Sequence, residues 1–124
     1  KLFHPSVVKI SAYFRDKDNC SSILKQINQN YKVEAVSTNG RDIETTSKGV
    51  DKGTGLLTLC NHLGINIDDT ITFGDSSNDI AILRRSGYAV VMGNASEDVK
   101  QHADFVSLSV EADGVAHAIN TLFV

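Results

Sequence analysis

The sequence lacks the features that mark several large classes of protein. It has no apolar run that approaches the length of a membrane-spanning helix, so we expect no membrane partner. Its 12 basic and 15 acidic residues give a net charge of -3. That balance excludes a broad basic surface for nucleic acid, so any phosphate binding must be local. The two cysteines, Cys20 and Cys60, form no Cys-x-x-Cys pair, which is typical of reduced thiols in a cytoplasmic protein.

Hydrophobic patterning predicts two regions within the 124 residues, of which the first covers residues 1–47. In this region we predict a strand, a helix that begins at Asp18, and two strands joined by a turn at Asn39-Gly40. The predicted ranges are 7–14 for the first strand, 18–30 for the helix, and 32–38 and 42–46 for the paired strands. This order is typical of an α+β sheet with one face towards water.

The second region, residues 48–124, alternates helices with strands. The predicted strands cover 70–73, 88–92 and 104–107, and the predicted helices cover 51–63, 77–86, 96–102 and 113–122. Such alternation favours neighbouring parallel strands joined by crossover helices. On the first helix we expect an inward apolar face made of Leu56, Leu59, Cys60 and Leu63. Gly64 is suited to end that helix.

Residues 70–79 have the outline of a magnesium and phosphate site. Gly74 allows a tight exit from the predicted strand, Asp75 follows at its carboxyl end, and Asn78 and Asp79 begin the next helix. Magnesium prefers oxygen ligands and keeps several waters, so one or two carboxylates and a phosphate oxygen make an ordinary site. Asp75 is the predicted direct ligand. Asp79 would bind metal-bound water or fix the loop, Asn78 would donate an amide N–H to substrate, and helix capping is the plain alternative for both.

Lys52 is the predicted phosphate-binding cation. It falls in the first turn of a helix, where a positive charge is unfavourable unless an anion is also present. A phosphate would remove that conflict, because the helix N–H groups and the ammonium would contact the same oxygens. An exposed surface lysine is the plain alternative.

Residues 92–95 follow another predicted strand at its carboxyl end, where ligands collect in parallel sheets. They are placed to border the same pocket. A plain turn into the next helix explains Asn94 equally well.

The pattern Gly-Asp-x-x-Asn-Asp followed by Ile-x-x-Leu, with Val50-Asp51-Lys52-Gly53 before it, resembles the haloacid dehalogenase-like phosphatases, specifically their Cof-type sugar-phosphatase branch. Residues 86–95, 99–100, 103–104 and 113–116 also follow the C-terminal half of that family. The resemblance implies an α/β fold. Residues 48–124 would form the C-terminal part of a Rossmann-like parallel-sheet core, and residues 1–47 the end of an α+β cap domain.

The family's nucleophile motif, Asp-x-Asp-Gly-Thr/Val on a first strand, is absent from this sequence. The nearest candidate is Asp16-Lys17-Asp18, but Asn19-Cys20 replace the Gly-Thr. In addition, the residues between this segment and Lys52 are too few to hold the family's second motif and a cap domain. We interpret this segment as a charged turn into a helix. The chain is therefore expected to be the second half of an enzyme and to be inactive alone.

The resemblance implies magnesium-dependent hydrolysis of a small phosphomonoester, such as a sugar phosphate, through an aspartyl-phosphate. Lys52, Asp75 and Asp79 would be the catalytic residues in this half, with Asp75 and Asp79 at the metal and Lys52 and Asn78 at the phosphate. Self-association or pairing with the missing half is also expected. Two alternatives stay open: a P-type ATPase, which carries a similar loop beside membrane helices, and a non-catalytic phosphate- or partner-binding module.

Overall fold

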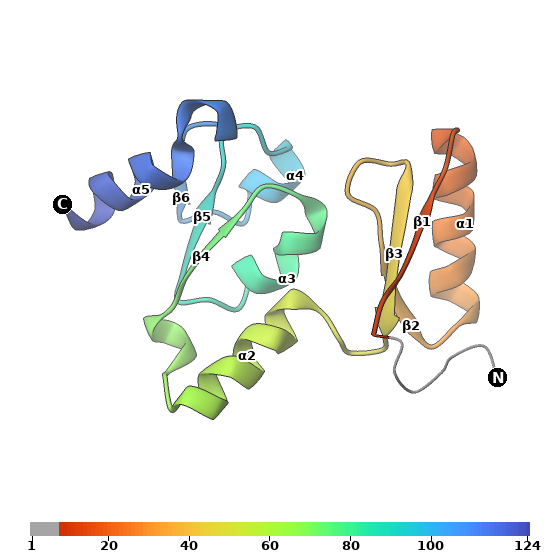
Figure 1. Cartoon of the computed structure of the whole chain (residues 1–124), viewed down its shortest axis with the longest axis horizontal. Helices are drawn as coiled ribbons and strands as arrows, with labels where there is room; N and C mark the ends of the chain where they lie inside the picture. Colours follow the sequence, from red (N-terminus) through yellow and green to blue (C-terminus); the bar gives the residue numbers. More distant parts are fainter. Residues whose placement is uncertain (1–7) are drawn as a thin grey trace. The chain divides into compact units, whose positions relative to one another are not determined.

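The computed structural model describes residues 8–124 and divides the chain into two compact units, Lys1–Asp51 and Lys52–Val124. Figure 1 draws unit 1 from red to yellow and unit 2 from green to blue. Within residues 8–124, each unit has its own sheet of three strands. The assignment of unit 1 to a cap domain stays a prediction.

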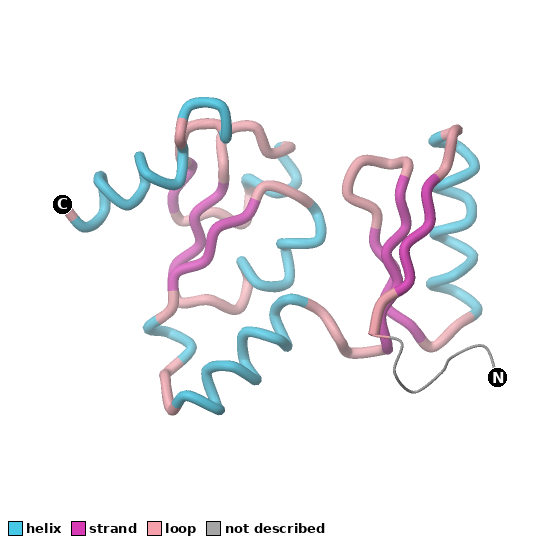
Figure 2. Tube along the Cα trace, viewed as in Figure 1, coloured by secondary structure: helices cyan, strands magenta, loops and turns pink. Residues whose placement is uncertain are grey.

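Unit 1 is a small antiparallel sheet with one long helix. Its elements are β1 Ile10–Tyr13, α1 Lys17–Asn30, β2 Val33–Val36 and β3 Asp42–Ser47. The strand order is β1-β3-β2, and β2 and β3 form the predicted hairpin, with Gly40 at a φ of 77° in its turn. Helix α1 lies along one face of the sheet (Figure 2), where Cys20, Ala35 and Ile43 form the buried core. The predicted order of elements in this region is confirmed.

Two details of unit 1 differ from the sequence-based prediction. Helix α1 begins after Asp16, whose carboxylate accepts a hydrogen bond from the Asp18 N–H at 3.1 Å, so Asp16 rather than Asp18 is the cap. Both acids suit a helix start, and the extended backbone of Asp16 decides between them. The first strand is shorter than predicted, and Val7 lies outside the described residues.

Asp42 fixes the β2–β3 hairpin and gives a prediction for acid stability. Its buried carboxylate accepts hydrogen bonds from the Ser37 hydroxyl, the Thr38 hydroxyl and N–H, and the Asn39 N–H. Burial alone would raise the pKa of Asp42, but these donors outweigh it and lower the pKa from 3.8 to about 2. The ionised carboxylate therefore stabilises the folded unit above about pH 4, and this contribution is lost as the pH falls towards 2.

We expect Asp42→Asn to lower the free energy of unfolding by about 2 kcal/mol at neutral pH and to flatten its pH dependence across that acid range. Chemical denaturation followed by circular dichroism at several pH values measures both effects. Asp18→Asn is the matched control, because Asp18 is an exposed acid of the same unit. Equal acid sensitivity of the wild-type and Asp42→Asn proteins would contradict the assignment.

Unit 2 alternates helices with strands, as predicted. Its elements are α2 Lys52–Leu63, η1 Ile67–Asp69, β4 Ile71–Gly74, η2 Ser77–Asp79, α3 Ile80–Leu83, β5 Tyr88–Val91, α4 Glu97–Lys100, β6 Phe105–Val106, η3 Val110–Ala112 and α5 Gly114–Phe123, where η marks a single 3-10 turn. The strands are parallel in the order β4-β5-β6. Gly74 pairs with Val91 and Val91 with Val106, so the three strands end together at one edge. This confirms the parallel α/β sheet.

The core of unit 2 lies on both faces of this sheet, because successive strand side chains alternate between faces. One face is covered by α3 and α4 and holds the largest buried apolar cluster, made of Leu83, Ala89, Val91, Ala95 and Val99. On the other face His117 of α5 stacks on Phe105, with ring centroids 6.1 Å apart. Both faces of β5 are buried, which explains its continuous apolar sequence.

The inward face predicted for α2 is partly wrong. Cys60 and Gly53 are buried, but Leu59 and Leu63 are 54% and 57% exposed. The helix contacts α3 through its glycine side, so these leucines project from unit 2 and the described residues of that unit do not cover them. The periodicity located the apolar residues correctly but could not show which of them would be covered within this chain.

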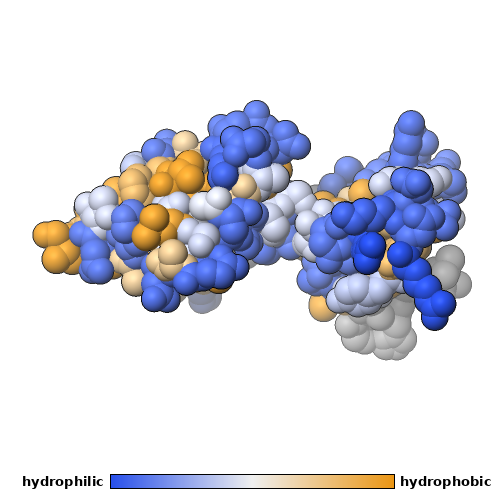
Figure 3. Space-filling model, turned by 90° about the horizontal axis from the view of Figure 1, so that it is seen from above, coloured by the Kyte–Doolittle hydropathy of each residue, from blue (hydrophilic) through white to orange (hydrophobic). Residues whose placement is uncertain are grey.

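Unit 2 also leaves an open sheet edge and apolar surface. Strand β4 is an edge strand, and its Ile71 is 37% exposed. Helix α5 exposes Val115, Ile119 and Phe123, which are spaced four residues apart on one face. Figure 3 shows apolar surface on unit 2, at the end of that unit that bears α5. Within residues 8–124, no helix combines the length and apolar content needed to cross a bilayer.

Candidate active site at the carboxyl end of β4

The loop that follows β4 folds tightly back on itself at Gly74. A side chain at this position would lie 2.7 Å from Cβ of Asp79, which is closer than real atoms approach. Glycine therefore allows the start of the next helical turn to pack directly on the end of the strand. Asp75 leaves the strand exposed to solvent, and Asp79 returns beneath the loop.

Asp79 is buried, with 6% of its surface exposed, and its carboxylate holds the loop together. Its Oδ2 accepts hydrogen bonds from the N–H groups of Asp75 and Ser76, at 3.0 and 3.1 Å, and from the Ser76 hydroxyl at 3.2 Å. Its Oδ1 accepts a hydrogen bond from the Lys52 ammonium. Burial would raise the pKa of Asp79, but the donors from Lys52, Asp75 and Ser76 outweigh it and hold the pKa below its ordinary value.

Lys52 is the first residue of α2, and its side chain contacts the loop after β4 within unit 2. Its Nζ forms an ion pair with Asp79 and lies 3.5 Å from Oδ1 of Asn78. The lysine side chain is 51% exposed, so the pair is buried on the Asp79 side and open on the other. An ammonium has three N–H donors, and two are used by these contacts. One remains for an oxygen of a bound anion.

Gly53 explains how Lys52 comes so close to the loop. A Cβ atom at this position would lie 2.3 Å from the carbonyl oxygen of Ala81, in α3. The backbones of α2 and α3 therefore touch at a point that admits no side chain. This contact sets the distance between the first turn of α2 and the loop.

The Asn78 carboxamide is oriented by its neighbours. Its Oδ1 accepts a hydrogen bond from the Ser76 hydroxyl at 2.7 Å and faces the Lys52 ammonium. Because the Lys52 ammonium can only donate, it assigns the oxygen of the amide to the inner side. The Nδ2 end is then available to donate to a ligand. Ser76, which sequence reasoning missed, thus links Asn78 to Asp79; its place one residue after Asp75 and three before Asp79, typical of a capping box, was the available signal.

Asp75 is held from the opposite side of the site by Asn94. The Asn94 Nδ2 donates to Oδ2 of Asp75 at 3.2 Å, and the Asn94 Oδ1 accepts from the Val110 N–H at 3.0 Å. Asp75 is exposed, so its carboxylate can also reach a solvent-borne ligand. The structure therefore brings all four predicted residues, Lys52, Asp75, Asn78 and Asp79, to one loop system.

The carboxylate oxygens at this site are suitable ligands for magnesium. Within residues 8–124, the side chains of His, Cys, Asp and Glu do not gather in threes or more as a metal site. A zinc ion generally takes three or four such ligands, whereas magnesium keeps several waters and needs one or two carboxylates. Asp75 offers an exposed carboxylate. The oxygens of Asp79 are engaged by Lys52 and by the loop N–H groups, which suits it to a supporting position.

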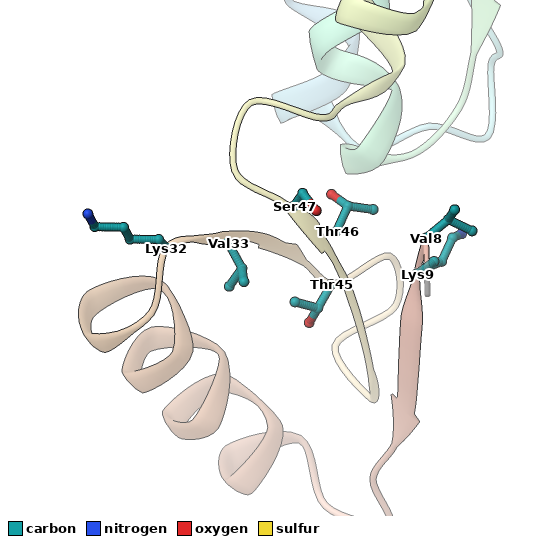
Figure 4. Close-up of a pocket in the computed structure, with 7 residues that line it drawn as sticks. All are labelled: Val8, Lys9, Lys32, Val33, Thr45, Thr46 and Ser47. Carbon is teal, nitrogen blue, oxygen red and sulfur yellow. The ribbon is translucent and has the colours of Figure 1, made fainter. Parts of the chain in front are cut away.

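A separate hollow lies on unit 1 (Figure 4). It is lined by Val8, Lys9, Lys32, Val33, Thr45, Thr46 and Ser47. The Lys9 ammonium is already paired with Glu44 at 2.9 Å. The hollow shares no residue with the loop system of β4.

Comparison with known proteins places this geometry in a family. The family model described as haloacid dehalogenase-like hydrolase matches residues 3–119. A uracil-derivative phosphatase, YcsE of Bacillus subtilis, is 32% identical over 112 residues, which are 90% of this chain and 45% of that protein. A phosphoglycolate phosphatase of Methanopyrus kandleri is 37% identical over 113 residues, covering 90% of this chain and 48% of that protein.

Solved structures give the same answer. A haloacid dehalogenase-like hydrolase from B. subtilis superposes with a TM-score of 0.88 at 32% identity, over 98% of this chain and 44% of that one. The subclass IIB sugar phosphatase BT4131 superposes with a TM-score of 0.81 at 30% identity, over 93% of this chain and 43% of that one. The chain thus spans a little under half the length of these relatives. Because the family model matches most of the sequence and the solved relatives share its fold, this chain belongs to the haloacid dehalogenase-like hydrolase family.

Proposed function

We propose that this chain acts within a longer polypeptide that hydrolyses small phosphomonoesters, such as sugar phosphates, with Mg²⁺ as cofactor. The observation that carries the proposal is the Lys52–Asp79 ion pair beside the exposed Asp75, at the carboxyl end of a parallel sheet. Relatives that are phosphatases, one of them a sugar phosphatase, support the reaction class. We place the activity in the cytoplasm, which two buried free thiols support.

Each residue has a distinct task in this proposal. Lys52 donates its remaining N–H to a phosphate oxygen, and Asn78 donates from Nδ2 to another. Asp79 keeps the ammonium in place and anchors the loop N–H groups. Asp75 supplies the metal-ligating carboxylate of this half. Bound Mg²⁺ would neutralise charge on the phosphate oxygens.

The nucleophile and the general acid/base are proposed to lie in a segment outside residues 1–124. Asp16, the alternative nucleophile considered above, caps helix α1 with its carboxylate, which supports a structural role. In this proposal Asp75 ligates the metal through Oδ1 while its Oδ2 accepts a hydrogen bond from Asn94, so it is given no part in the attack on phosphorus. The remaining residues of the site stabilise charge and do not form a covalent intermediate.

The open edge of β4 supports pairing with that outside segment. An exposed edge strand presents unpaired N–H and C=O groups. Unit 2 also exposes apolar side chains that association would cover, on α2 and on α5: Leu59, Leu63, Val115, Ile119 and Phe123. We propose that the remaining polypeptide, or a second copy of the chain, covers this surface.

The test compares residues 1–124 with the polypeptide encoded by the complete reading frame. We expect no magnesium-dependent hydrolysis of p-nitrophenyl phosphate by residues 1–124, and hydrolysis when the N-terminal half is present in the same chain or added separately. Turnover by residues 1–124 that Asp16→Asn abolishes would instead identify Asp16 as the nucleophile. A complete polypeptide that binds Mg²⁺ and phosphate without turnover would favour the binding-module alternative.

A further inference from the structure

Asn94 joins the loops that follow all three strands of unit 2. It lies in the turn after β5, accepts a hydrogen bond from Val110 in the segment after β6, and donates one to Asp75 after β4. These loops meet because the parallel strands end in register. The carboxamide thus spans two segments that are distant in sequence and lie beside the candidate active site.

The oxygen end of Asn94 is firmly anchored. The preceding residue, Gly93, donates its N–H to the Leu108 carbonyl at 3.0 Å, and a Cβ atom there would lie 2.8 Å from the Ser107 carbonyl oxygen. The turn is therefore tied by backbone contacts to the segment after β6. With Oδ1 held by the Val110 N–H, the amide nitrogen is directed at the Asp75 carboxylate.

We propose that Asn94 is a positioning residue for Asp75, and through it for the metal and the phosphate. The inference rests on the proposed function. Asp75 is exposed, and an exposed aspartate samples several rotamers unless a partner selects one. The donor from Asn94 engages Oδ2 and leaves Oδ1 for ligation. Ligating carboxylates whose second oxygen is hydrogen-bonded bind their metal more tightly than unsupported ones.

The test measures metal binding directly, in the protein encoded by the complete reading frame, with Mn²⁺ as the probe and electron paramagnetic resonance as the readout of free ion. We expect Asn94→Ala to weaken Mn²⁺ binding roughly tenfold. The Mg²⁺ concentration for half-maximal hydrolysis of p-nitrophenyl phosphate should rise by a similar factor. The KM for that substrate at saturating Mg²⁺ should change much less, which a general loss of structure would not produce.

The matched control is Asn66→Ala. Asn66 is also an exposed loop asparagine of unit 2 and also accepts one backbone hydrogen bond, from the Asp68 N–H at 3.3 Å, but it precedes β4 at the other end of the strand. Val110→Pro removes the N–H that holds the Asn94 oxygen while keeping the amide donor. We expect Asn66→Ala to bind Mn²⁺ as the wild type does and Val110→Pro to give an intermediate loss.

Several outcomes would overturn the inference. Wild-type Mn²⁺ affinity in Asn94→Ala would do so, and a Val110→Pro loss as large as that of Asn94→Ala would assign the effect to the loop instead. Absence of Mn²⁺ binding by the wild type would remove both this inference and the proposed metal site. If the wild type binds Mn²⁺, Asn94→Ala weakens that binding, and no phosphatase activity exists, then the proposed function fails and the positioning of Asp75 stands.

Discussion

Asp75→Asn in the complete polypeptide is expected to lower kcat/KM for p-nitrophenyl phosphate at least roughly 100-fold, which corresponds to about 3 kcal/mol of transition-state stabilisation. The substitution keeps the size and the hydrogen-bonding oxygen of the side chain but removes the charge that binds the cation. Because Asp75 is exposed at the end of β4, the fold should be unaffected. Steady-state kinetics over a range of Mg²⁺ concentrations measures the loss.

Asp69→Asn is the control for this prediction, since Asp69 is an exposed acid that precedes the same strand. It should leave the kinetics within about threefold of the wild type, a change below 1 kcal/mol. Raising the Mg²⁺ concentration should recover part of the activity of Asp75→Asn, because the substitution weakens the metal site without removing the phosphate contacts. An Asp75→Asn enzyme with wild-type kinetics at low Mg²⁺ would refute the assignment of Asp75 as ligand.

Lys52→Met is expected to have the second large effect, on activity and stability together. The variant loses the donor to phosphate, which should cost roughly 100-fold or more in kcat/KM. It also leaves Asp79 buried without its ion-pair partner. Because the lysine is half exposed, we expect a loss of about 1–2 kcal/mol in the free energy of unfolding, less than for a fully buried pair.

A second substitution separates these two effects. Asp79→Asn in the Lys52→Met background removes the unpaired charge while keeping an oxygen for the loop N–H groups, so stability should partly recover and activity should not. Lys100→Met is the control, because Lys100 pairs at 3.0 Å with an exposed carboxylate, that of Glu97. If the double variant regained activity along with stability, Lys52 would be a structural residue and its phosphate contact would be refuted.

The sequence predicted the parts of the molecule that depend on local pattern. The strand before Gly74, the placement of Asp75 at its end and the parallel order of three strands all followed from apolar runs, glycines and helix–strand alternation. The proximity of Lys52 to Asn78 and Asp79 also agrees with the expectation of one shared site, although they are separated by 26 and 27 residues. Their catalytic roles stay predictions.

Other parts could not be read from the sequence, because they depend on contacts between distant segments. The capping of α1 by Asp16 was one of two equivalent local choices. The exposure of Leu59 and Leu63 depends on what surrounds α2, which periodicity does not contain. The bond between Asn94 and Asp75 joins two loops that follow different strands, so a turn residue and a positioning residue look the same in the sequence.

The close contact between α2 and α3 at Gly53 determines what is needed to rebuild this site in another protein. Lys52 is held at its working distance by the absence of a side chain on its neighbour, since even a methyl group would strike the Ala81 carbonyl. The position of the Lys52 ammonium thus depends on residue 53 having no side chain. Moving the charged residues of this loop onto another scaffold would therefore require a pair of helices whose backbones can touch in the same way. A graft of the site should include the contact between α2 and α3 as well as the charged side chains.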